Sequence, residues 1–184
     1  MGSIEDRLRR ALRAAVDERN EASPAAWTGR IEARRTELLA RREVIEVIDH
    51  GAGSRGNGRG VAASPKRYRA GVAELVRSKS TYPVWGRFLY HLVRELRPDV
   101  CLEFGSGFGI STAYLGAGLR ENGSGTLASV EGASSIAALA RETVTALDLS
   151  GVVQVVEDRF ANAIEALPPS TPAPGFIFLD GHHD

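Results

Sequence analysis

The sequence predicts an α/β protein in which a parallel sheet of about four strands follows an N-terminal helical extension. From residue 99 onwards, short apolar runs of strand length alternate with segments of helical periodicity. Glycines cluster at the end of the first run, where a strand turns into a helix. Residues 1–48 instead carry apolar side chains at helical spacing throughout. Repeated strand-helix-strand units of this size favour parallel strands covered by helices.

Composition limits the chain to one sizeable core. Its 184 residues are 43% hydrophobic and 25% charged, which is typical of one globular domain with an appendage. No run approaches the roughly 18 apolar residues of a membrane span, and no apolar secretory core follows the N-terminal charges. We therefore expect a cytoplasmic protein without a membrane partner. The single cysteine, Cys101, excludes an internal disulfide and is expected in the core.

The extension, residues 1–48, is predicted to contain two helices. Ser3 and Asp6 form a capping-box pattern, and apolar residues then recur at helical spacing to about residue 20. Ser23 and Pro24 restart the pattern, which predicts a second helix to about residue 48. Residues 49–65 are rich in glycine and predict a loop.

Residues 66–184 are predicted to form a Rossmann-like domain. Helices are expected over 66–77 and 84–96, the second ending before a proline. The alternating part that follows predicts strands at 100–104, 126–131, 152–156 and 176–180, and helices at 110–119, 134–147 and 161–167. Sheets of this kind bind ligands at the carboxyl ends of their strands.

The turn after the first strand has the pattern Glu-x-Gly-x-Gly-x-Gly, from Glu103 to Gly109, and leads into a helix. Glycines let a main chain approach a ligand closely, and a helix N-terminus offers free amides. A dinucleotide fingerprint would need glycine where this chain has Ile110, and the Gly-Lys-Ser/Thr of a phosphate loop is absent.

The string from Leu102 to Thr112 resembles the signature of class I S-adenosylmethionine-dependent methyltransferases, in particular their O-methyltransferase-like branch. The upstream pieces 49–54 and 88–93 resemble an uncharacterised bacterial group within that superfamily. The resemblance implies S-adenosylmethionine as the cofactor. It places Glu103 at the methionine end, with a strand-end carboxylate that receives loop amides as the alternative. The other cofactor-binding residues that it implies in this turn are Gly105, Ser106, Gly107, Gly109, Ser111 and Thr112.

Two further strand ends carry acids. The resemblance implies that Glu131 accepts both ribose hydroxyls and that Asp158 receives the adenine amino group, with Phe160 packing on the ring. Glu157 competes with Asp158 for that role, and either acid is also suited to cap a helix.

Asp180 and His183 close the fourth strand, where the resemblance places methyl transfer. Carboxylate and imidazole suit deprotonation of an acceptor hydroxyl, and in some relatives the strand-end aspartate holds a divalent metal. A plain polar turn is the alternative. His50, in the glycine-rich loop, is a hypothetical part of a lid over the cofactor.

The resemblance implies transfer of a methyl group to an oxygen or nitrogen of an unknown, small-molecule acceptor. Because the family's sheet has seven strands, it also implies a chain truncated after the fourth. Residues 51–98 hold ten basic and two acidic side chains, so nucleic acid stays open as a partner, although pairing with the acidic residues 99–184 is favoured. A homo-oligomer is a further possibility. The alternatives to a methyltransferase are a non-catalytic cofactor-binding or interaction module and an NAD-dependent oxidoreductase.

Overall fold

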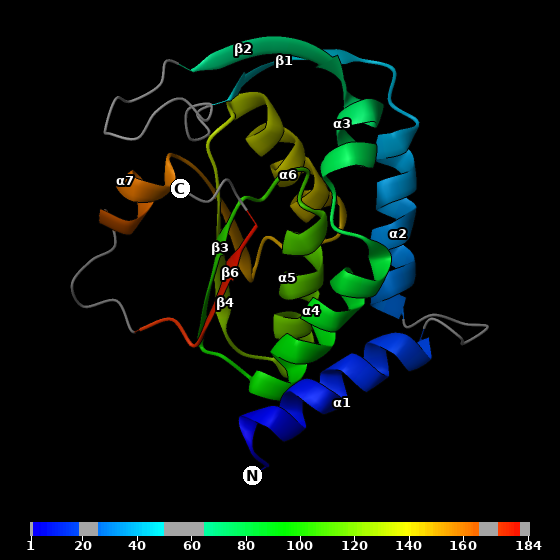
Figure 1. Cartoon of the computed structure of the whole chain (residues 1–184), viewed down its shortest axis with the longest axis vertical. Helices are drawn as coiled ribbons and strands as arrows, with labels where there is room; N and C mark the ends of the chain where they lie inside the picture. The colour runs from blue at the N-terminus through cyan, green and yellow to red at the C-terminus, as the bar shows by residue number, and fades with distance from the viewer. Residues whose placement is uncertain (1, 19–25, 50–64, 166–172, 181–184) are drawn as a thin grey trace, which may run out of the picture.

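The centre of the molecule is a parallel sheet of four strands in the order β5-β4-β3-β6, as the computed structural model shows (Figure 1). The structure describes residues 2–18, 26–49, 65–165 and 173–180. The strands are β3 (Val100–Phe104), β4 (Thr126–Glu131), β5 (Val153–Glu157) and β6 (Phe176–Leu179). The predicted α/β fold class with its parallel sheet is confirmed.

Helices cover the two faces of this sheet unequally (Figure 1). One face carries α4 (Pro83–Leu96), α5 (Ile110–Asn122) and α6 (Ser134–Ala146), and the other carries the short α7 (Phe160–Glu165). The face toward α5 holds the main core, which includes the fully buried Tyr114. A Cβ at Gly86 of α4 would lie 2.3 Å from the Tyr114 ring, so glycine is what lets α4 and α5 approach this closely.

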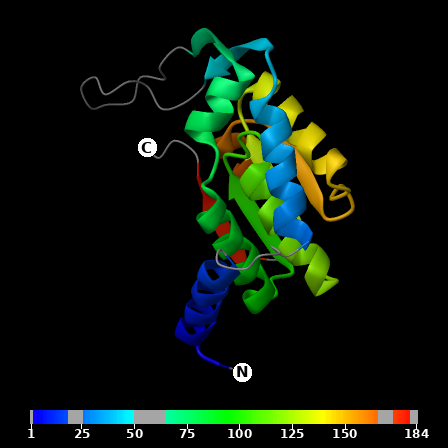
Figure 2. The ribbon, with the colours of Figure 1, turned by 90° about the vertical axis from the view of Figure 1, so that its right-hand side faces the viewer.

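The N-terminal helices pack on the domain. Ser3 is the N-cap of helix α1 (Ile4–Asp17): its hydroxyl accepts from the Asp6 amide, and the Asp6 carboxylate accepts from the Ser3 amide, which confirms the predicted capping box. Both views of the ribbon place α1 against α4 (Figure 2). The buried Arg87 of α4 donates a 3.0 Å hydrogen bond to the carbonyl of Ala15 there.

The second predicted helix was wrong in its length. Helix α2 (Ala26–Leu39) ends nine residues early, and β1 (Val44–Asp49) follows it. Strand β1 pairs antiparallel with β2 (Lys66–Gly71), so the helix predicted over 66–77 is also wrong in its first half, and α3 (Val72–Lys79) forms the rest. The reason is tertiary pairing: β-branched residues suit a strand, and Val47 is buried as the hairpin packs on α6.

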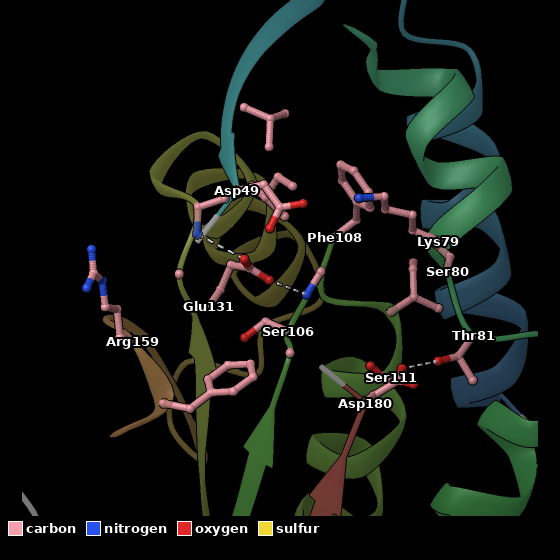
Figure 3. Close-up of a pocket in the computed structure, with 18 of the residues that line it drawn as sticks. Asp49, Lys79, Ser80, Thr81, Ser106, Phe108, Ser111, Glu131, Arg159 and Asp180 are labelled. Carbon is pink, nitrogen blue, oxygen red and sulfur yellow. Dashed lines mark hydrogen bonds between the residues drawn. The ribbon is translucent and has the colours of Figure 1, made fainter. Parts of the chain in front are cut away.

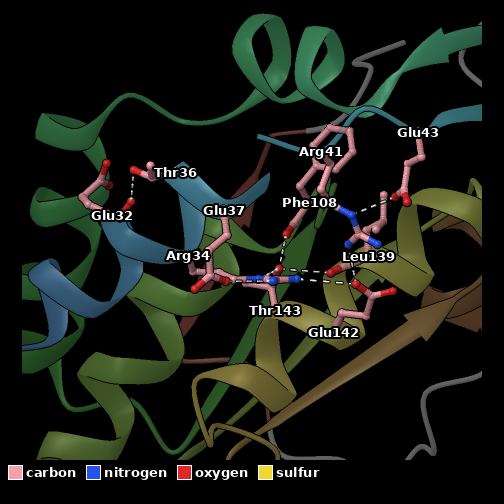
Figure 4. A network of polar contacts seen from close by, with 10 residues as sticks. All are labelled: Glu32, Arg34, Thr36, Glu37, Arg41, Glu43, Phe108, Leu139, Glu142 and Thr143. Carbon is pink, nitrogen blue, oxygen red and sulfur yellow. Dashed lines mark hydrogen bonds and ion pairs between the residues drawn. The ribbon is translucent and has the colours of Figure 1, made fainter. Parts of the chain in front are cut away.

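A polar network joins the extension to the domain (Figure 4). Arg34 and Arg41 both form ion pairs with Glu142 of α6. Arg34 also donates to the hydroxyl of Thr143, which in turn donates to the carbonyl of Phe108 in the glycine turn. The sequence favoured pairing of the acidic residues of 99–184 with the basic residues of 51–98. Glu142 instead pairs with two arginines of the extension.

Two smaller expectations concern Cys101 and the membrane. Cys101 is buried in the core as predicted, and burial raises the pKa of its thiol to about 12. Among the described residues, no helix combines the length and apolar character needed to cross a bilayer.

Candidate functional site

A cavity of about 530 Å³ lies at the carboxyl ends of the central strands (Figure 3). That size is in the range of small-molecule sites, and the position is the one at which open parallel sheets bind ligands. Its walls come from the glycine turn, the β1–β2 hairpin, the segment between α3 and α4, and the starts of α6 and α7. Of the predicted site residues, the cavity is lined by Gly105, Ser106, Gly107, Ser111, Glu131, Phe160 and Asp180.

The glycine turn has a backbone conformation that other residues rarely adopt. Gly105, Gly107 and Gly109 have φ angles of 104°, 51° and 80°, in the left-handed region. A Cβ at Gly107 would meet nothing within 4 Å, which leaves the cavity wall open there. A Cβ at Gly109 would lie 3.1 Å from the backbone of Ala140 in α6. Gly107 therefore leaves room for a ligand, whereas Gly109 allows two helices to pack, and it does not line the cavity.

Glu131 ends β4 and is held by two backbone amides. Its Oε2 accepts from the Gly107 amide and its Oε1 from the Ala133 amide, both at 3.0 Å (Figure 3). Burial raises the pKa of Glu131, and these two amides, the Gly132 amide and Lys79 oppose the shift. A carboxylate has about four lone-pair sites, so the side chain is orientated in advance as a hydrogen-bond acceptor for a ligand.

Glu103 lies beneath the cavity and does not line it. The side chain is fully buried, and its Oε2 accepts from the hydroxyls of Thr112 at 2.6 Å and Ser129 at 2.5 Å. The Ser129 hydroxyl also bonds to that of Ser106, which does line the cavity. Burial raises the pKa of Glu103 to about 7, opposed by the hydroxyls of Ser111, Ser129 and Thr112. The structure thus surrounds Glu103 with hydroxyls. The alternative interpretation from the sequence, a strand-end carboxylate, expected hydrogen bonds from loop amides instead.

The acids at the end of β5 bond to neighbouring protein groups, and the contact of Asp158 with adenine stays a prediction. Asp158 accepts hydrogen bonds from the Arg159 amide and from Asn162, as a residue that caps α7 would, and it does not line the cavity. Glu157 pairs with Arg141 of α6. Phe160 does line the cavity, where its ring meets that of Phe104 edge to face at 5.4 Å.

Asp180 follows β6 and reaches the cavity from the opposite side to Glu131 (Figure 3). The Thr81 hydroxyl donates to its Oδ2 at 3.3 Å. Within the described residues, no group of three or more potential ligands is placed to hold a metal ion. His183 and His50 lie outside the described residues, so their expected roles stay predictions.

The sequence did not predict the part of the cavity wall that the β1–β2 hairpin and the end of α3 with its following segment form, which we call the cover. Val47, Asp49 and Tyr68 line it from the hairpin, Lys79 lines it from the end of α3, and Thr81 from the segment that follows α3. The Lys79 ammonium donates to the Tyr68 hydroxyl at 3.1 Å, which ties the two parts of the cover together. The clue was the β-branched run of residues 44–48, whose strand character was interpreted as helix.

Comparisons with known proteins agree with this architecture. Residues 102–184 match the model of a family described as a methyltransferase domain. No curated protein matches the chain. Among solved structures, the O-methyltransferase from Bacillus cereus in complex with SAH is 26% identical with a TM-score of 0.52, over 56% of this chain and 47% of that one.

Two other solved structures extend the comparison. The O-methyltransferase TomG from Streptomyces achromogenes, in complex with SAM, is 23% identical with a TM-score of 0.52, over 56% of this chain and 46% of that one. A Klebsiella pneumoniae protein is 18% identical with a TM-score of 0.56, over 86% of this chain and 55% of that one. The chain thus spans about half the length of these proteins. It has the fold of the class I S-adenosylmethionine-dependent O-methyltransferases.

The residues present fit S-adenosylmethionine. The cavity has an open wall at Gly107, a carboxylate at Glu131 with spare lone pairs, and an aromatic ring at Phe160. Its charged lining side chains are three carboxylates and two cations: Asp49, Glu131, Asp180, Lys79 and Arg159. A small excess of negative charge suits a ligand that carries a positively charged sulfur.

Proposed function

We propose that this chain forms the cofactor-binding part of an S-adenosylmethionine-dependent methyltransferase that methylates an oxygen or nitrogen nucleophile. The observation that carries the proposal is the Glu131 carboxylate, which the Gly107 and Ala133 amides hold at the edge of the cavity. A carboxylate fixed in this way accepts from two adjacent hydroxyls, as a ribose presents them.

The predicted residues in and beneath the cavity have separate roles in this proposal. Glu131 holds the ribose, the backbone of Gly105–Gly107 lies against the ribose and methionine portion, and Phe160 packs on the adenine ring. Glu103 acts indirectly, because its hydrogen bonds to Thr112 and Ser129 stiffen the floor under the glycine turn. Bound S-adenosylmethionine would supply a methyl group on a positively charged sulfur.

Asp180 is assigned the acceptor side of the reaction. Its carboxylate reaches the cavity opposite Glu131, where it takes the proton from the acceptor's hydroxyl or amine as that atom becomes methylated. Thr81 orientates the carboxylate through its 3.3 Å hydrogen bond. The rest of the catalytic effect comes from holding acceptor and donor together out of water.

Calorimetric titration tests the proposal directly. The chain is titrated with S-adenosylmethionine and, separately, with NAD. We expect saturable heat with the first and none with the second. Saturable binding of NAD without binding of S-adenosylmethionine would overturn the proposal in favour of an oxidoreductase.

The second candidate function is a cofactor-binding module without catalysis. Turnover separates the two functions. Release of S-adenosylhomocysteine with a panel of hydroxyl and amine acceptors supports the enzyme, whereas binding without release supports the module.

A further inference from the structure

Helix α2 of the N-terminal extension reaches the wall of the cavity. This helix lies outside the residues that match the methyltransferase domain. Its Arg35 extends to the segment between α3 and α4, where Nη2 donates a 2.7 Å hydrogen bond to the carbonyl of Thr81. Thr81 lines the cavity, and its hydroxyl donates to Asp180 Oδ2 at 3.3 Å (Figure 3). Arg35 is therefore connected through one residue to the carboxylate on the acceptor side of the site.

The guanidinium of Arg35 is held in one orientation by Glu32, which lies one turn earlier on α2. Arg35 Nε donates to Glu32 Oε2 at 2.8 Å, and Nη2 donates to Oε1 at 3.1 Å. This two-point contact matches the planar fork of arginine and restricts its rotation. Nη2 carries a second hydrogen, which serves Thr81. The Arg35 side chain is 13% exposed, so solvent competes little for these bonds.

Tyr114 ties Glu32 to the core of the domain. Its side chain is fully buried on α5, and its hydroxyl donates to Glu32 Oε1 at 2.8 Å. Burial raises the pKa of this hydroxyl and the Glu32 charge raises it further, although the charges of Arg35 and Arg87 oppose the shift. At neutral pH the hydroxyl therefore stays protonated and can donate. The fixed part of the molecule thus extends from α5 through Glu32 and Arg35 to the carbonyl of Thr81.

The Asp180 carboxylate depends on this support, because the main chain alone does not fix it. The Asp180 amide donates to the Phe104 carbonyl at 2.9 Å, which holds the backbone after β6. The side chain still has rotamers to choose from, and the Thr81 hydroxyl restricts that choice more strongly when Thr81 itself is held. Thr81 lies between α3 and α4, outside regular secondary structure. The hydrogen bond from Arg35 supplies a fixed point in this connection.

We infer that Arg35 is a positioning residue for methyl transfer. Through Thr81 it directs the Asp180 carboxylate toward the methyl group of bound S-adenosylmethionine, where the acceptor gives up its proton. A catalytic group displaced by about 1 Å loses much of its effect. The inference rests on the proposed function, since it takes S-adenosylmethionine as the ligand and Asp180 as the group that faces the methyl. The N-terminal extension thus contributes to the reaction as well as to stability.

Two cofactor analogues measure the position of Asp180 without turnover. Sinefungin carries an ammonium group at the position of the transferred methyl group, whereas S-adenosylhomocysteine has only an uncharged sulfur there. A carboxylate that faces this position pairs with the ammonium group, so the unmodified chain should bind sinefungin about tenfold more tightly than S-adenosylhomocysteine. Calorimetry gives both affinities, and their ratio reports on Asp180. Equal affinities would overturn the inference.

The Arg35→Lys variant separates positioning from stability. Lysine keeps the positive charge beside Glu32 but lacks the fork whose second arm reaches Thr81. We expect the affinity for sinefungin to fall about tenfold and that for S-adenosylhomocysteine to stay within about twofold. An equal loss for both analogues, or no loss for sinefungin, would overturn the inference.

Arg30→Lys is the matched control. Arg30 also lies on α2 and donates to a main-chain carbonyl, that of Leu147 at 2.9 Å, but Leu147 does not line the cavity. The same substitution there should change neither affinity. A selective loss of sinefungin binding in Arg30→Lys as well would mean that any loosening of α2 moves Asp180, which contradicts a specific role of Arg35.

A double-mutant cycle tests the route through Thr81. Thr81→Val keeps the carbonyl that accepts from Arg35 but removes the hydroxyl that donates to Asp180. It should lower sinefungin affinity as Arg35→Lys does, and the two together should lower it no further, because they interrupt one path. Additive losses would show that Arg35 acts by another route and would overturn the inference. Failure of the unmodified chain to bind either analogue would instead contradict the proposed function.

Discussion

The backbone amide of Gly107 donates a 3.0 Å hydrogen bond to the Glu131 carboxylate, so the glycine turn and the end of β4 hold one another in place. The second oxygen of Glu131 accepts from Ala133. A carboxylate with both oxygens fixed loses little side-chain entropy when it binds a ligand, which is the benefit of preorganisation.

Glu131→Gln should weaken S-adenosylmethionine binding by about tenfold or more, which corresponds to about 1.4 kcal/mol. The amide has one acceptor oxygen, so its NH₂ group would face one of the two backbone donors that the carboxylate now satisfies. Calorimetry measures the affinity. The control is Glu157→Gln, on the residue paired with Glu131 in the sheet register but directed to Arg141. An equal effect of both substitutions would contradict the role of Glu131.

The sequence predicted the parts of the site that depend on local pattern. The strand from Val100 to Phe104 and its glycine turn were visible because apolar residues of the strand stop where the glycines begin. The hairpin cover was not visible, because β1 and β2 are separated by 16 residues and form only by pairing with one another. The contact of Asp158 with adenine was predicted from the resemblance and not from a local pattern. Its hydrogen bonds to Arg159 and Asn162 depend on where α7 begins.

Asp180→Asn should lower the rate of methyl transfer by about a hundredfold or more, because general bases contribute on that scale. S-adenosylmethionine affinity should stay within about twofold, since Glu131 and the glycine turn carry that interaction in the proposal. Release of S-adenosylhomocysteine at saturating cofactor reports the rate. Asp158→Asn is the matched control, because this acid also follows a strand but does not line the cavity. A parallel loss of cofactor affinity in Asp180→Asn would assign the residue to cofactor binding instead.

Alanine substitutions should separate the roles of Gly107 and Gly109 in the turn. Both have positive φ, so each substitution costs about 1–2 kcal/mol of backbone strain. At Gly109 the new Cβ also meets Ala140 and Thr143 at 3.1 Å, which adds about 1–3 kcal/mol of overpacking. At Gly107 it projects into open space at the cavity wall.

Gly109→Ala should therefore lose more stability in urea unfolding than Gly107→Ala. Calorimetry should show the larger loss of S-adenosylmethionine affinity in Gly107→Ala, provided that both proteins are folded at the temperature of the titration. Equal unfolding midpoints for the two variants would show that α6 yields to the Gly109 methyl group.

The buried Glu103 should make folding stability depend on pH. Burial raises its pKa from 4.5 to about 7, so between these values the folded protein binds more protons than the unfolded chain. The contribution to stability is complete below about pH 4.5 and is lost as the pH rises to about 7. Its size is on the order of 3 kcal/mol, because each pKa unit corresponds to about 1.4 kcal/mol.

Glu103→Gln removes this titration while its amide can still bond to the hydroxyls of Thr112 and Ser129. The difference in free energy of unfolding between the two proteins should therefore change across pH 4.5–7 and be flat above it. Urea unfolding at a series of pH values measures it. Asp180→Asn supplies an internal check, because the Asp180 charge raises the pKa of Glu103 and its removal should move the transition to lower pH. A difference that stays constant over the whole range would mean that Glu103 remains ionised in the folded protein, stabilised by its three hydroxyl neighbours.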